Sequence, residues 1–251
     1  MELIGGPDRK LPVPGKFVLP LIGHRRESPS AITFRFSTEG TGFTYLSNQA
    51  VRMALPGVDD PWGAARLFSL SSSPSEPGEL AVTCRISDTP FKQALARLAP
   101  GQTAEVYGPM GSFLLDVERP AVFLAGGIGI TPFRGMVRYA ADVGVSHRHR
   151  LLYSARVPEE LLFRSEFDAI ARRSDRFSAQ YSITRPGDST AGWDGRVGRI
   201  DERWVRSAIA GIDRPRFYLA GLPEMVRDTV QLLTRLEVPE DDIDYEVFRG
   251  F

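Results

Sequence analysis

Hydrophobic and polar residues alternate in the first half of the chain, and turn residues interrupt the alternation. Residues 32–36, Ile-Thr-Phe-Arg-Phe, place every second side chain on the same side, which is the period of a strand with one buried face. Short strands at this spacing, with turns between them, favour an antiparallel barrel. The pattern predicts strands at residues 17–22, 31–36, 50–55, 80–86 and 103–107, and one helix at residues 90–98.

The second half instead combines unbroken apolar runs with amphipathic segments. Residues 121–125, Ala-Val-Phe-Leu-Ala, do not alternate, which is typical of a strand buried on both faces of a parallel sheet. Further strands are predicted at residues 151–154, 178–184, 217–220 and 243–248, with helices at residues 133–143, 159–172, 202–210 and 224–236. This order predicts a doubly wound α/β domain with a five-stranded parallel sheet, whose ligand lies beyond the carboxyl ends of the strands.

The two patterns predict two domains. The 251 residues are enough for two domains of ordinary size, each with its own core. We expect a loose lead-in at residues 1–15, an antiparallel β-barrel domain at residues 16–118 and an α/β domain at residues 119–251.

A glycine-rich turn follows the apolar run at residues 121–125. Gly126, Gly127 and Gly129 have no Cβ atom, so the backbone can take positive φ and a ligand can approach it closely. Thr131 and Pro132 suit the N-cap and the first position of a helix. Free amide groups and the helix dipole would converge there, which predicts a phosphate cradle for a dinucleotide. A tight turn without a ligand is the alternative, because the third glycine of the usual fingerprint is missing.

Composition and charge exclude several classes of function. Lysine plus arginine and aspartate plus glutamate number 31 each, so no global field attracts nucleic acid or an anionic membrane. The single Cys84 excludes a disulfide framework and a four-cysteine iron–sulfur cluster within this chain. Residues 147–149, His-Arg-His, are interpreted as a surface turn, and no metal site is expected. Without a leader or an apolar span of membrane length, we expect a cytoplasmic protein.

One motif of the first half resembles a motif of a known family. Residues 66–72, Arg-Leu-Phe-Ser-Leu-Ser-Ser, are similar to the flavin motif Arg-x-Tyr-Ser-x-x-Ser of the ferredoxin-NADP reductase family, with Phe68 in place of the commoner tyrosine. The resemblance covers residues 17–251. It implies that Arg66 pairs with the flavin phosphate, that Phe68 lies against the isoalloxazine ring and that Ser69 hydrogen-bonds near flavin N5. An ordinary barrel strand followed by a serine-rich turn is the alternative.

Two further stretches fit the same flavin pocket. Asn48 and Gln49 occupy the place of the family's Gly-Gln turn, and asparagine tolerates positive φ best after glycine. Lys92 stands where relatives often have a phosphate-binding serine, and a solvated helix charge is its alternative. The flavin contacts that the resemblance implies are Arg66, Leu67, Phe68, Ser69, Cys84, Arg85, Phe91, Lys92 and Phe251.

In the second half the resemblance implies a site for a nicotinamide nucleotide. Relatives that prefer the 2′-phosphorylated cofactor often have serine or threonine followed by arginine, as in Thr184-Arg185, so NADPH is favoured over NADH. The alternative for Arg156 and Arg185 is that both are exposed charges at strand ends. The implied contacts are Gly126, Gly127, Gly129, Thr131, Ser154, Arg156, Thr184, Arg185, Gly221 and Met225.

The last landmarks concern catalysis. Residues 220–225 resemble the family motif Cys-Gly-x-x-x-Met, but Ala220 replaces the cysteine. Hydride transfer does not require that thiol, because positioning of nicotinamide C4 against flavin N5 carries most of the catalysis. Glu246 and Phe248 resemble the family's C-terminal Glu-x-aromatic, and either Phe248 or Phe251 is expected to cover the flavin, with a buried strand-end aromatic as the alternative. The implied catalytic residues are Ser69, Glu246 and Phe248.

These features predict a flavin-dependent oxidoreductase that passes hydride between NADPH or NADH and FAD N5, and single electrons to or from a separate acceptor. FAD is expected rather than FMN, the acceptor is a ferredoxin, flavodoxin or oxygenase component, and the protein is expected to be a monomer without nucleic-acid or membrane partners. One alternative is a non-catalytic flavin- or nucleotide-binding subunit of a larger redox complex. A short-chain type of dehydrogenase is disfavoured, because the chain lacks Tyr-x-x-x-Lys and residues 66–72 would be unexplained.

Overall fold

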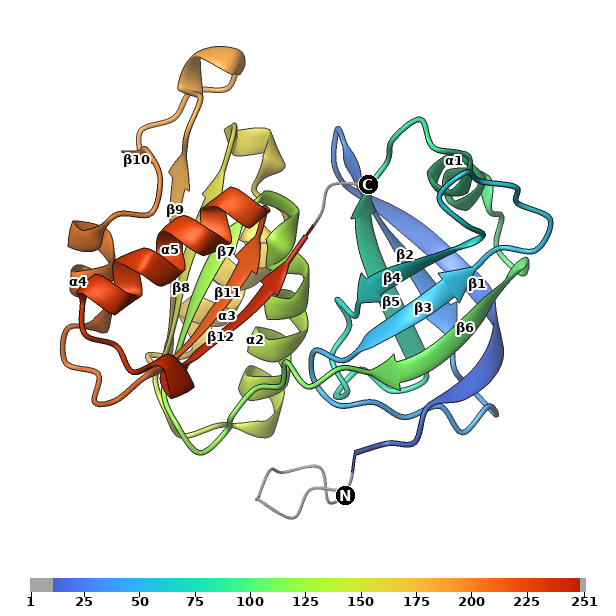
Figure 1. Cartoon of the computed structure of the whole chain (residues 1–251), viewed down its shortest axis with the longest axis horizontal. Helices are drawn as coiled ribbons and strands as arrows, with labels where there is room; N and C mark the ends of the chain where they lie inside the picture. Colours follow the sequence, from blue (N-terminus) through green and yellow to red (C-terminus); the bar gives the residue numbers. More distant parts are fainter. Residues whose placement is uncertain (1–10, 249–251) are drawn as a thin grey trace.

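The computed structural model describes residues 11–248, which form a barrel and an α/β unit side by side (Figure 1). The barrel is a six-stranded antiparallel sheet of order β4-β3-β6-β1-β2-β5. Its elements are β1 Gly15–Ser28, β2 Ala31–Ser37, β3 Ala50–Ala54, β4 Ala65–Ser69, β5 Glu79–Arg85, α1 Pro90–Arg97 and β6 Thr103–Met110. A bridge between Leu70 and Val82 connects the two edges, so the sheet closes on itself.

The core of the barrel comes from the alternating positions. Phe34 and Phe36 of β2 are fully buried, whereas Arg35 between them faces outwards. Phe91 and Leu95 of α1 cover one end of the same core. The predicted antiparallel barrel is confirmed, because each strand contributes one apolar face to a shared interior.

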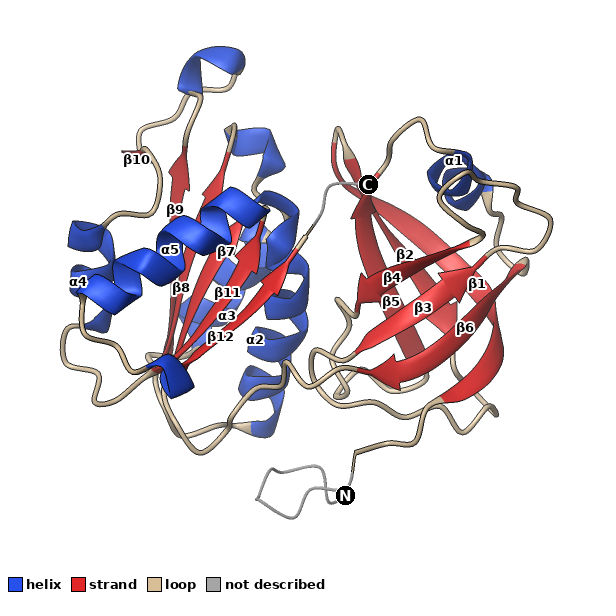
Figure 2. Ribbon diagram, viewed as in Figure 1, coloured by secondary structure: helices blue, strands red, loops and turns tan. Residues whose placement is uncertain are grey.

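The second sheet is parallel throughout and has the order β10-β9-β8-β7-β11-β12. Its strands are β7 Ala121–Gly126, β8 His149–Ala155, β9 Phe177–Ile183, β10 Arg196–Val197, β11 Arg216–Gly221 and β12 Ile243–Val247. The helices are α2 Thr131–Val143, α3 Arg164–Arg173, α4 Glu202–Ile209 and α5 Pro223–Arg235. Helices α2 and α3 cover one face, and α4 and α5 cover the other (Figure 2). A doubly wound sheet of this kind places its ligand at the carboxyl ends of β7 and β11, where the strand order reverses.

Four local predictions were wrong. The parallel sheet has six strands rather than five, because the two-residue strand β10 pairs with the end of β9 and is too short to show a period. Helix α3 begins at Arg164 rather than residue 159, since Phe163 takes a left-handed conformation after a short turn. The N-cap position of α2 belongs to Ile130, not Thr131, because a 3₁₀ turn at Gly127–Ile130 runs directly into the helix. Strand β4 contains the flavin motif and was missing from the predicted strands.

Only part of the run at residues 147–149 is the surface turn that we predicted: His147 and Arg148 lie in the loop before β8, and His149 does not. His149 opens β8, is only 4% exposed, and accepts a 3.2 Å hydrogen bond at Nδ1 from the N–H of Ala121. Burial first, and then the nearby His147 and Arg150, lower the pKa of His149 to about 4. It is therefore a neutral packing residue. Within residues 11–248, no three histidine, cysteine or acidic side chains form a group that could hold a metal ion.

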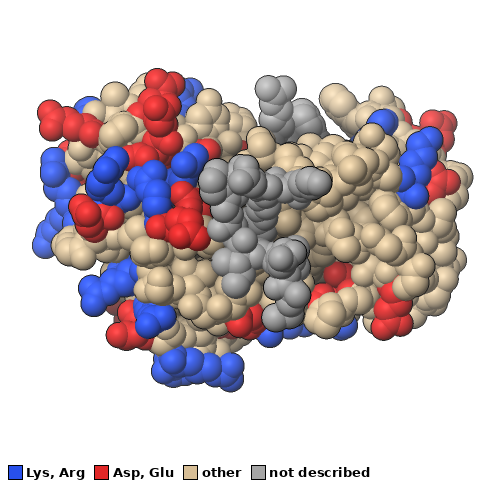
Figure 3. All heavy atoms as spheres, turned by 90° about the horizontal axis from the view of Figure 1, so that it is seen from below, with Lys and Arg blue, Asp and Glu red and all other residues tan. Residues whose placement is uncertain are grey.

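Helix α2 faces the barrel across the boundary between the two units (Figure 1). A Cβ atom at Gly135 would lie 2.6 Å from the carbonyl oxygen of Ser72, so the helix backbone packs directly on the loop after β4. The predicted division at residues 118 and 119 stays a prediction; the connection between the sheets runs from residue 111 to residue 120. Figure 3 shows charges of both signs mixed over the α/β unit and fewer on the barrel. No helix within residues 11–248 is long and apolar enough to cross a membrane.

Candidate active site

Arg66 of β4 is held in place by a buried carboxylate. Its Nη2 lies 2.7 Å from Oδ1 of Asp60, its Nη1 donates to the carbonyl of Gly63 at 2.6 Å, and its guanidinium lies 5.2 Å from the Phe91 ring centroid. Burial acts to raise the pKa of Asp60, but the N–H groups of Phe91 and Trp62 and the Arg66 guanidinium outweigh it and lower that pKa. Arg66 is therefore oriented beside the start of α1.

Lys92 of α1 lies over the ring of Phe68, as Arg66 lies over the ring of Phe91. The side chain is only 5% exposed, and its Nζ stands 4.9 Å from the centroid of the Phe68 ring, so the solvated alternative is wrong. No carboxylate within residues 11–248 forms an ion pair with it. Burial raises the pKa of the neighbouring Cys84 thiol, and the Lys92 ammonium opposes that rise. A buried cation without an acidic partner is a strong candidate for binding an anion.

The aromatic residues of the pocket pack together. Phe68 and Phe91 have ring centroids 6.1 Å apart and are both buried. Leu67 points the other way and is exposed, because side chains alternate along a strand, so it does not join the pocket. Asn48 has φ of 71°, as predicted for a residue that replaces glycine, and Gln49 accepts the N–H of Leu46 at 2.8 Å. Two cations beside aromatic rings fit a ligand that has both a phosphate and a planar ring system.

Ser69 and Glu246 meet between the two units. The Ser69 hydroxyl donates to Oε1 of Glu246 at 2.8 Å, although 177 residues separate them. Burial raises the pKa of Glu246, and the bond from Ser69 opposes that rise. The second oxygen, Oε2, is buried without a hydrogen-bond partner among residues 11–248. The site therefore contains a carboxyl group with one oxygen free for a ligand.

Phe248 lies directly after β12. Its N–H donates to the carbonyl of Gly221 at 2.9 Å, and its half-buried ring packs at the edge of the α/β core. The rival position, Phe251, lies outside the described residues. The ring of Phe248 is thus held near the carboxyl end of β11, beside Glu246.

The glycines of the turn are required by close packing. Gly127 has φ of +54°, and a Cβ atom at Gly129 would overlap the carbonyl oxygen of Ala220. A Cβ at Gly221 would lie 2.9 Å from Sδ of Met225, and one at Gly126 would lie 3.1 Å from Met225 Cγ. The turn, β11 and the start of α5 are therefore in contact, and the fully buried Thr131 fixes the start of α2. These contacts alone would also require glycine at these positions, so they are equally consistent with a tight turn that binds no ligand.

The ends of β8 and β9 bring two arginines together. The N–H of Thr184 donates to the carbonyl of Ala155 at 2.9 Å, and the N–H of Arg185 donates to the carbonyl of Arg156 at 2.8 Å. Both guanidinium groups lie close to Asp188, at 4.0 Å and 3.8 Å, and are 56% and 58% exposed. Ser154 directly precedes Ala155 in β8, and its hydroxyl accepts a 3.2 Å hydrogen bond from the hydroxyl of Ser182 on β9. The exposure of both side chains agrees with the alternative that these arginines are exposed charges at strand ends. It also leaves both guanidinium groups accessible to a ligand.

Sequence reasoning missed the acidic partners of the site. Asp60 orients Arg66, and Glu160 contacts Arg85 at 3.0 Å. Arg85 also reaches over the glycine turn, since its Nη2 lies 3.4 Å from where a Cβ atom of Gly127 would be. No regular sequence spacing points to these pairs: Arg66 lies six positions after Asp60, and Arg85 and Glu160 come from different units. Only the burial of a charge beside a motif arginine could have suggested them.

Comparisons with known proteins agree with this arrangement. The family described as oxidoreductase NAD-binding domain matches residues 123–231. The chain is 33% identical over 239 residues to ferredoxin–NADP reductase B of Sorangium cellulosum, covering 90% of this chain and 95% of that protein. It is 28% identical over 228 residues to the toluate 1,2-dioxygenase electron transfer component of Pseudomonas putida, covering 88% of this chain and 64% of the relative. Other relatives are longer, and the chain spans about half of their length.

The fold is shared with solved reductases. The structure of a ferredoxin NADP⁺ reductase from Neisseria gonorrhoeae with bound FAD and NADP superposes with a TM-score of 0.75 and 22% identity. The match covers 94% of this chain and 99% of that one. It therefore includes both units and their relative arrangement, and it shows the fold.

Proposed function

This chain belongs to the ferredoxin-NADP reductase family of oxidoreductases, and from that premise we propose that it uses FAD to pass electrons between NADPH and a separate one-electron acceptor protein. The observation that carries the proposal is the 2.8 Å hydrogen bond between Ser69 and Glu246. It joins the strand of the flavin motif to the edge of the sheet where a nucleotide binds. A bound flavin supplies a centre that exchanges hydride with a nicotinamide and single electrons with an acceptor.

On the flavin side, the cations and the aromatic residues have different proposed roles. Arg66 and Lys92 bind the phosphates, because they are cations beside aromatic rings and Lys92 has no carboxylate partner within residues 11–248. Phe68 and Phe91 provide apolar surface for the ring system. Two adjacent cations suit the diphosphate of FAD better than the single phosphate of FMN.

At the reacting end, Ser69 and Glu246 control protons. The bond to Oε1 of Glu246 fixes the orientation of the Ser69 hydroxyl, which supports its proposed place near the reacting nitrogen. Because burial raises the pKa of Glu246, this group holds a proton at Oε2 more readily than an exposed glutamate does. Phe248 limits access of water to the same place. These three residues are our proposed catalytic group.

For the nicotinamide nucleotide, the proposal rests on the carboxyl ends of the strands. Gly126, Gly127 and Gly129 form the turn that runs into the start of α2, and a pyrophosphate is proposed to bind the backbone amides there. Arg156 and Arg185 present two guanidinium groups to one point, which supports a 2′-phosphate and thus NADPH over NADH. Arg85 adds a third cation beside Gly127.

The acceptor protein is proposed from the electron count. Nicotinamide delivers an electron pair, whereas iron–sulfur and haem proteins accept single electrons. This chain has one cysteine and so cannot hold a four-cysteine cluster itself. The relative in Pseudomonas putida is named as the electron transfer component of a dioxygenase, which supports a ferredoxin or oxygenase component as the partner. Cytoplasmic location and a monomeric state stay predictions.

The test is the visible spectrum of the purified protein after incubation with FAD or with FMN and removal of free flavin. We expect retained FAD that loses its visible absorption when NADPH is added without oxygen, and a slower response to NADH. Retained flavin that neither nucleotide reduces would favour the non-catalytic subunit, which Ala220 keeps open because the family cysteine is missing. Failure to retain either flavin would overturn the proposal.

A further inference from the structure

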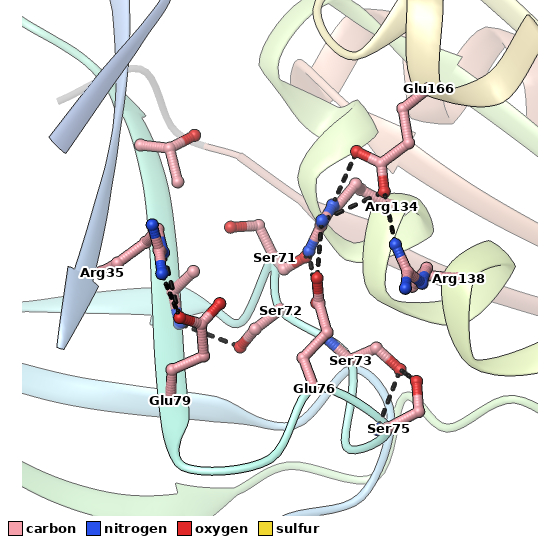
Figure 4. A network of polar contacts seen from close by, with 12 residues as sticks. Arg35, Ser71, Ser72, Ser73, Ser75, Glu76, Glu79, Arg134, Arg138 and Glu166 are labelled. Atoms are coloured by element: carbon pink, nitrogen blue, oxygen red, sulfur yellow. Dashed lines mark hydrogen bonds and ion pairs between the residues drawn. The ribbon is translucent and has the colours of Figure 1, made fainter. Parts of the chain in front are cut away.

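Arg134 of α2 reaches out of the α/β unit into the loop that follows the flavin motif. Its Nη1 and Nη2 donate to the two carboxylate oxygens of Glu76 at 2.6 Å and 2.9 Å, and Nη1 also donates to the carbonyl of Ser71 at 3.0 Å (Figure 4). Ser71 lies two residues after Ser69 in the same serine-rich segment. The arginine therefore makes three hydrogen bonds to the barrel, from a position two residues after Pro132.

The same guanidinium is also fixed within its own unit. Its Nη2 lies 3.0 Å from Oε1 of Glu166 on α3, and its Nε donates to Oε2 of that residue at 3.1 Å. The Arg134 side chain is 13% exposed. Burial acts to lower the pKa of Arg134, but Glu76 and Glu166 outweigh it and raise that pKa, so the group stays charged.

The barrel loop that receives Arg134 is itself held by hydrogen bonds. Glu76 Oε2 accepts the N–H of Ser73 at 2.8 Å, and the Ser72 hydroxyl accepts both the Tyr45 hydroxyl and the N–H of Ala81. With Gly135 packed against the Ser72 carbonyl, the helix and the loop touch along their backbones. A displacement at Arg134 would therefore move whole elements rather than one side chain.

A second ion pair also joins the two units, but it is weaker. Arg85 contacts Glu160 at 3.0 Å with 38% of its side chain exposed, so water screens the pair. The Arg134 contact has better geometry, because a bidentate pair of a guanidinium with a carboxylate fixes orientation as well as distance. It is therefore the stronger of the two ionic links.

We propose that Arg134 is a positioning residue that sets the glycine turn against the flavin motif, and that its bond to Glu76 aligns the nicotinamide with the flavin. This inference rests on the proposed function. The path is short at both ends, since Arg134 lies five positions after Gly129 and Ser71 lies two positions after Ser69. A misplacement of about 1 Å costs on the order of a hundredfold in rate when two reacting groups must meet.

The two carboxylates allow a matched comparison. Glu76→Gln removes the charge that links Arg134 to the barrel, whereas Glu166→Gln removes the charge within the α/β unit. We expect Glu76→Gln to lower the rate of flavin reduction at saturating NADPH about tenfold or more, with the half-saturating NADPH concentration nearly unchanged. Glu166→Gln should lower the melting temperature but reduce that rate much less.

A second measurement uses flavin-free protein and does not depend on activity. Amide hydrogen exchange in residues 70–78 should speed up in Glu76→Gln and stay close to wild type in Glu166→Gln. Arg134→Lys should fall between wild type and Glu76→Gln in the rate of reduction, because lysine keeps the charge and loses the bidentate geometry. Arg206→Met, which breaks an exposed pair with Glu202 inside α4, is the control and should change neither measurement.

Two results would overturn the inference. The first is a wild-type reduction rate in Glu76→Gln despite faster exchange in residues 70–78, which would make the contact structural only. The second is equal exchange in the two glutamine variants, which would mean that Arg134 does not couple the units through Glu76. If NADPH does not reduce flavin in the wild-type protein, the proposed function fails by itself, and the exchange comparison still decides whether the coupling exists.

Discussion

The cations at the two ends of the candidate site differ in how far water reaches them. Lys92 and Arg66 are largely covered within the barrel unit, where Arg66 is held by Asp60 and Lys92 faces an aromatic ring. Arg156 and Arg185 stand in the open around the exposed Asp188. Buried cations are oriented before a ligand arrives, whereas exposed ones are screened and mobile. The first arrangement suits a cofactor that stays bound, and the second suits a co-substrate that leaves after each turnover.

The largest effect is expected from Lys92→Met. Loss of a buried ammonium without an acidic partner in residues 11–248 should weaken flavin retention by about ten- to a hundredfold, which corresponds to about 1.5–3 kcal/mol for a charged hydrogen bond. The flavin-free protein should become more stable, because a buried amine that has no carboxylate partner within residues 11–248 has been removed. Flavin titration measures the expected loss of flavin affinity, and thermal melting of the apoprotein measures the expected gain in stability. A fall in both would mean that Lys92 is needed for folding.

Arg185→Ala should have the next largest effect, on the open end of the site. The Michaelis constant for NADPH should rise about tenfold, while that for NADH stays the same, because only NADPH has the 2′-phosphate that we propose the exposed guanidinium binds. Steady-state kinetics with each nucleotide checks this, with flavin content as the control. Equal effects on NADPH and NADH would make Arg185 a general surface charge.

A change in salt concentration should affect the two ends of the candidate site differently, without any substitution. Raising the salt concentration from about 0.01 M to 0.1 M shortens the Debye length from about 30 Å to about 10 Å, which screens the exposed arginines. We expect the Michaelis constant for NADPH to rise a fewfold while flavin retention hardly changes. Parallel kinetics and flavin-release measurements across this range test the contrast, and an equal salt dependence at both ends would contradict it.

The smallest effect concerns Glu246 and pH. A carboxyl group whose pKa is raised by folding contributes stability at low pH and loses it as pH rises through the folded-state pKa. Glu246→Gln removes that loss, so its melting temperature relative to the wild type should rise as pH increases from the unfolded-state pKa through the folded-state pKa, and should then stay level. The difference should be about 2–4 °C for each 1 kcal/mol in a chain of this size. Melting curves over a pH series measure it, and a difference independent of pH would contradict the assignment.

The candidate site was predictable where a motif is local. The glycines at 126, 127 and 129 and the segment at residues 66–72 were recognised because turn chemistry and strand position are encoded by neighbouring residues. The sequence did not decide whether Lys92 is buried or solvated, since a helix lysine has the same sequence signature in both cases. His149 was misread for the same reason: an arginine-rich surrounding concealed a residue that is 4% exposed.

Side-chain partners could not be predicted at all. Glu76 and Glu160 each pair with an arginine of the other unit, and nothing in the spacing of the sequence specifies which one. The short strand β10 was not predicted for a related reason, because two residues cannot show a period and their pairing depends on the end of β9. In each case the missing information was a contact between segments.

By itself the sequence determined a barrel followed by a doubly wound sheet, the glycine turn and the flavin motif, because hydrophobic period and backbone freedom act over a few neighbouring residues. Tertiary structure alone decided that Ser69 meets Glu246 across 177 residues and that Arg134 ties α2 to the barrel loop. Burial, pKa and charge pairing depend on which segments exclude water together, and that is settled only when the whole chain has folded.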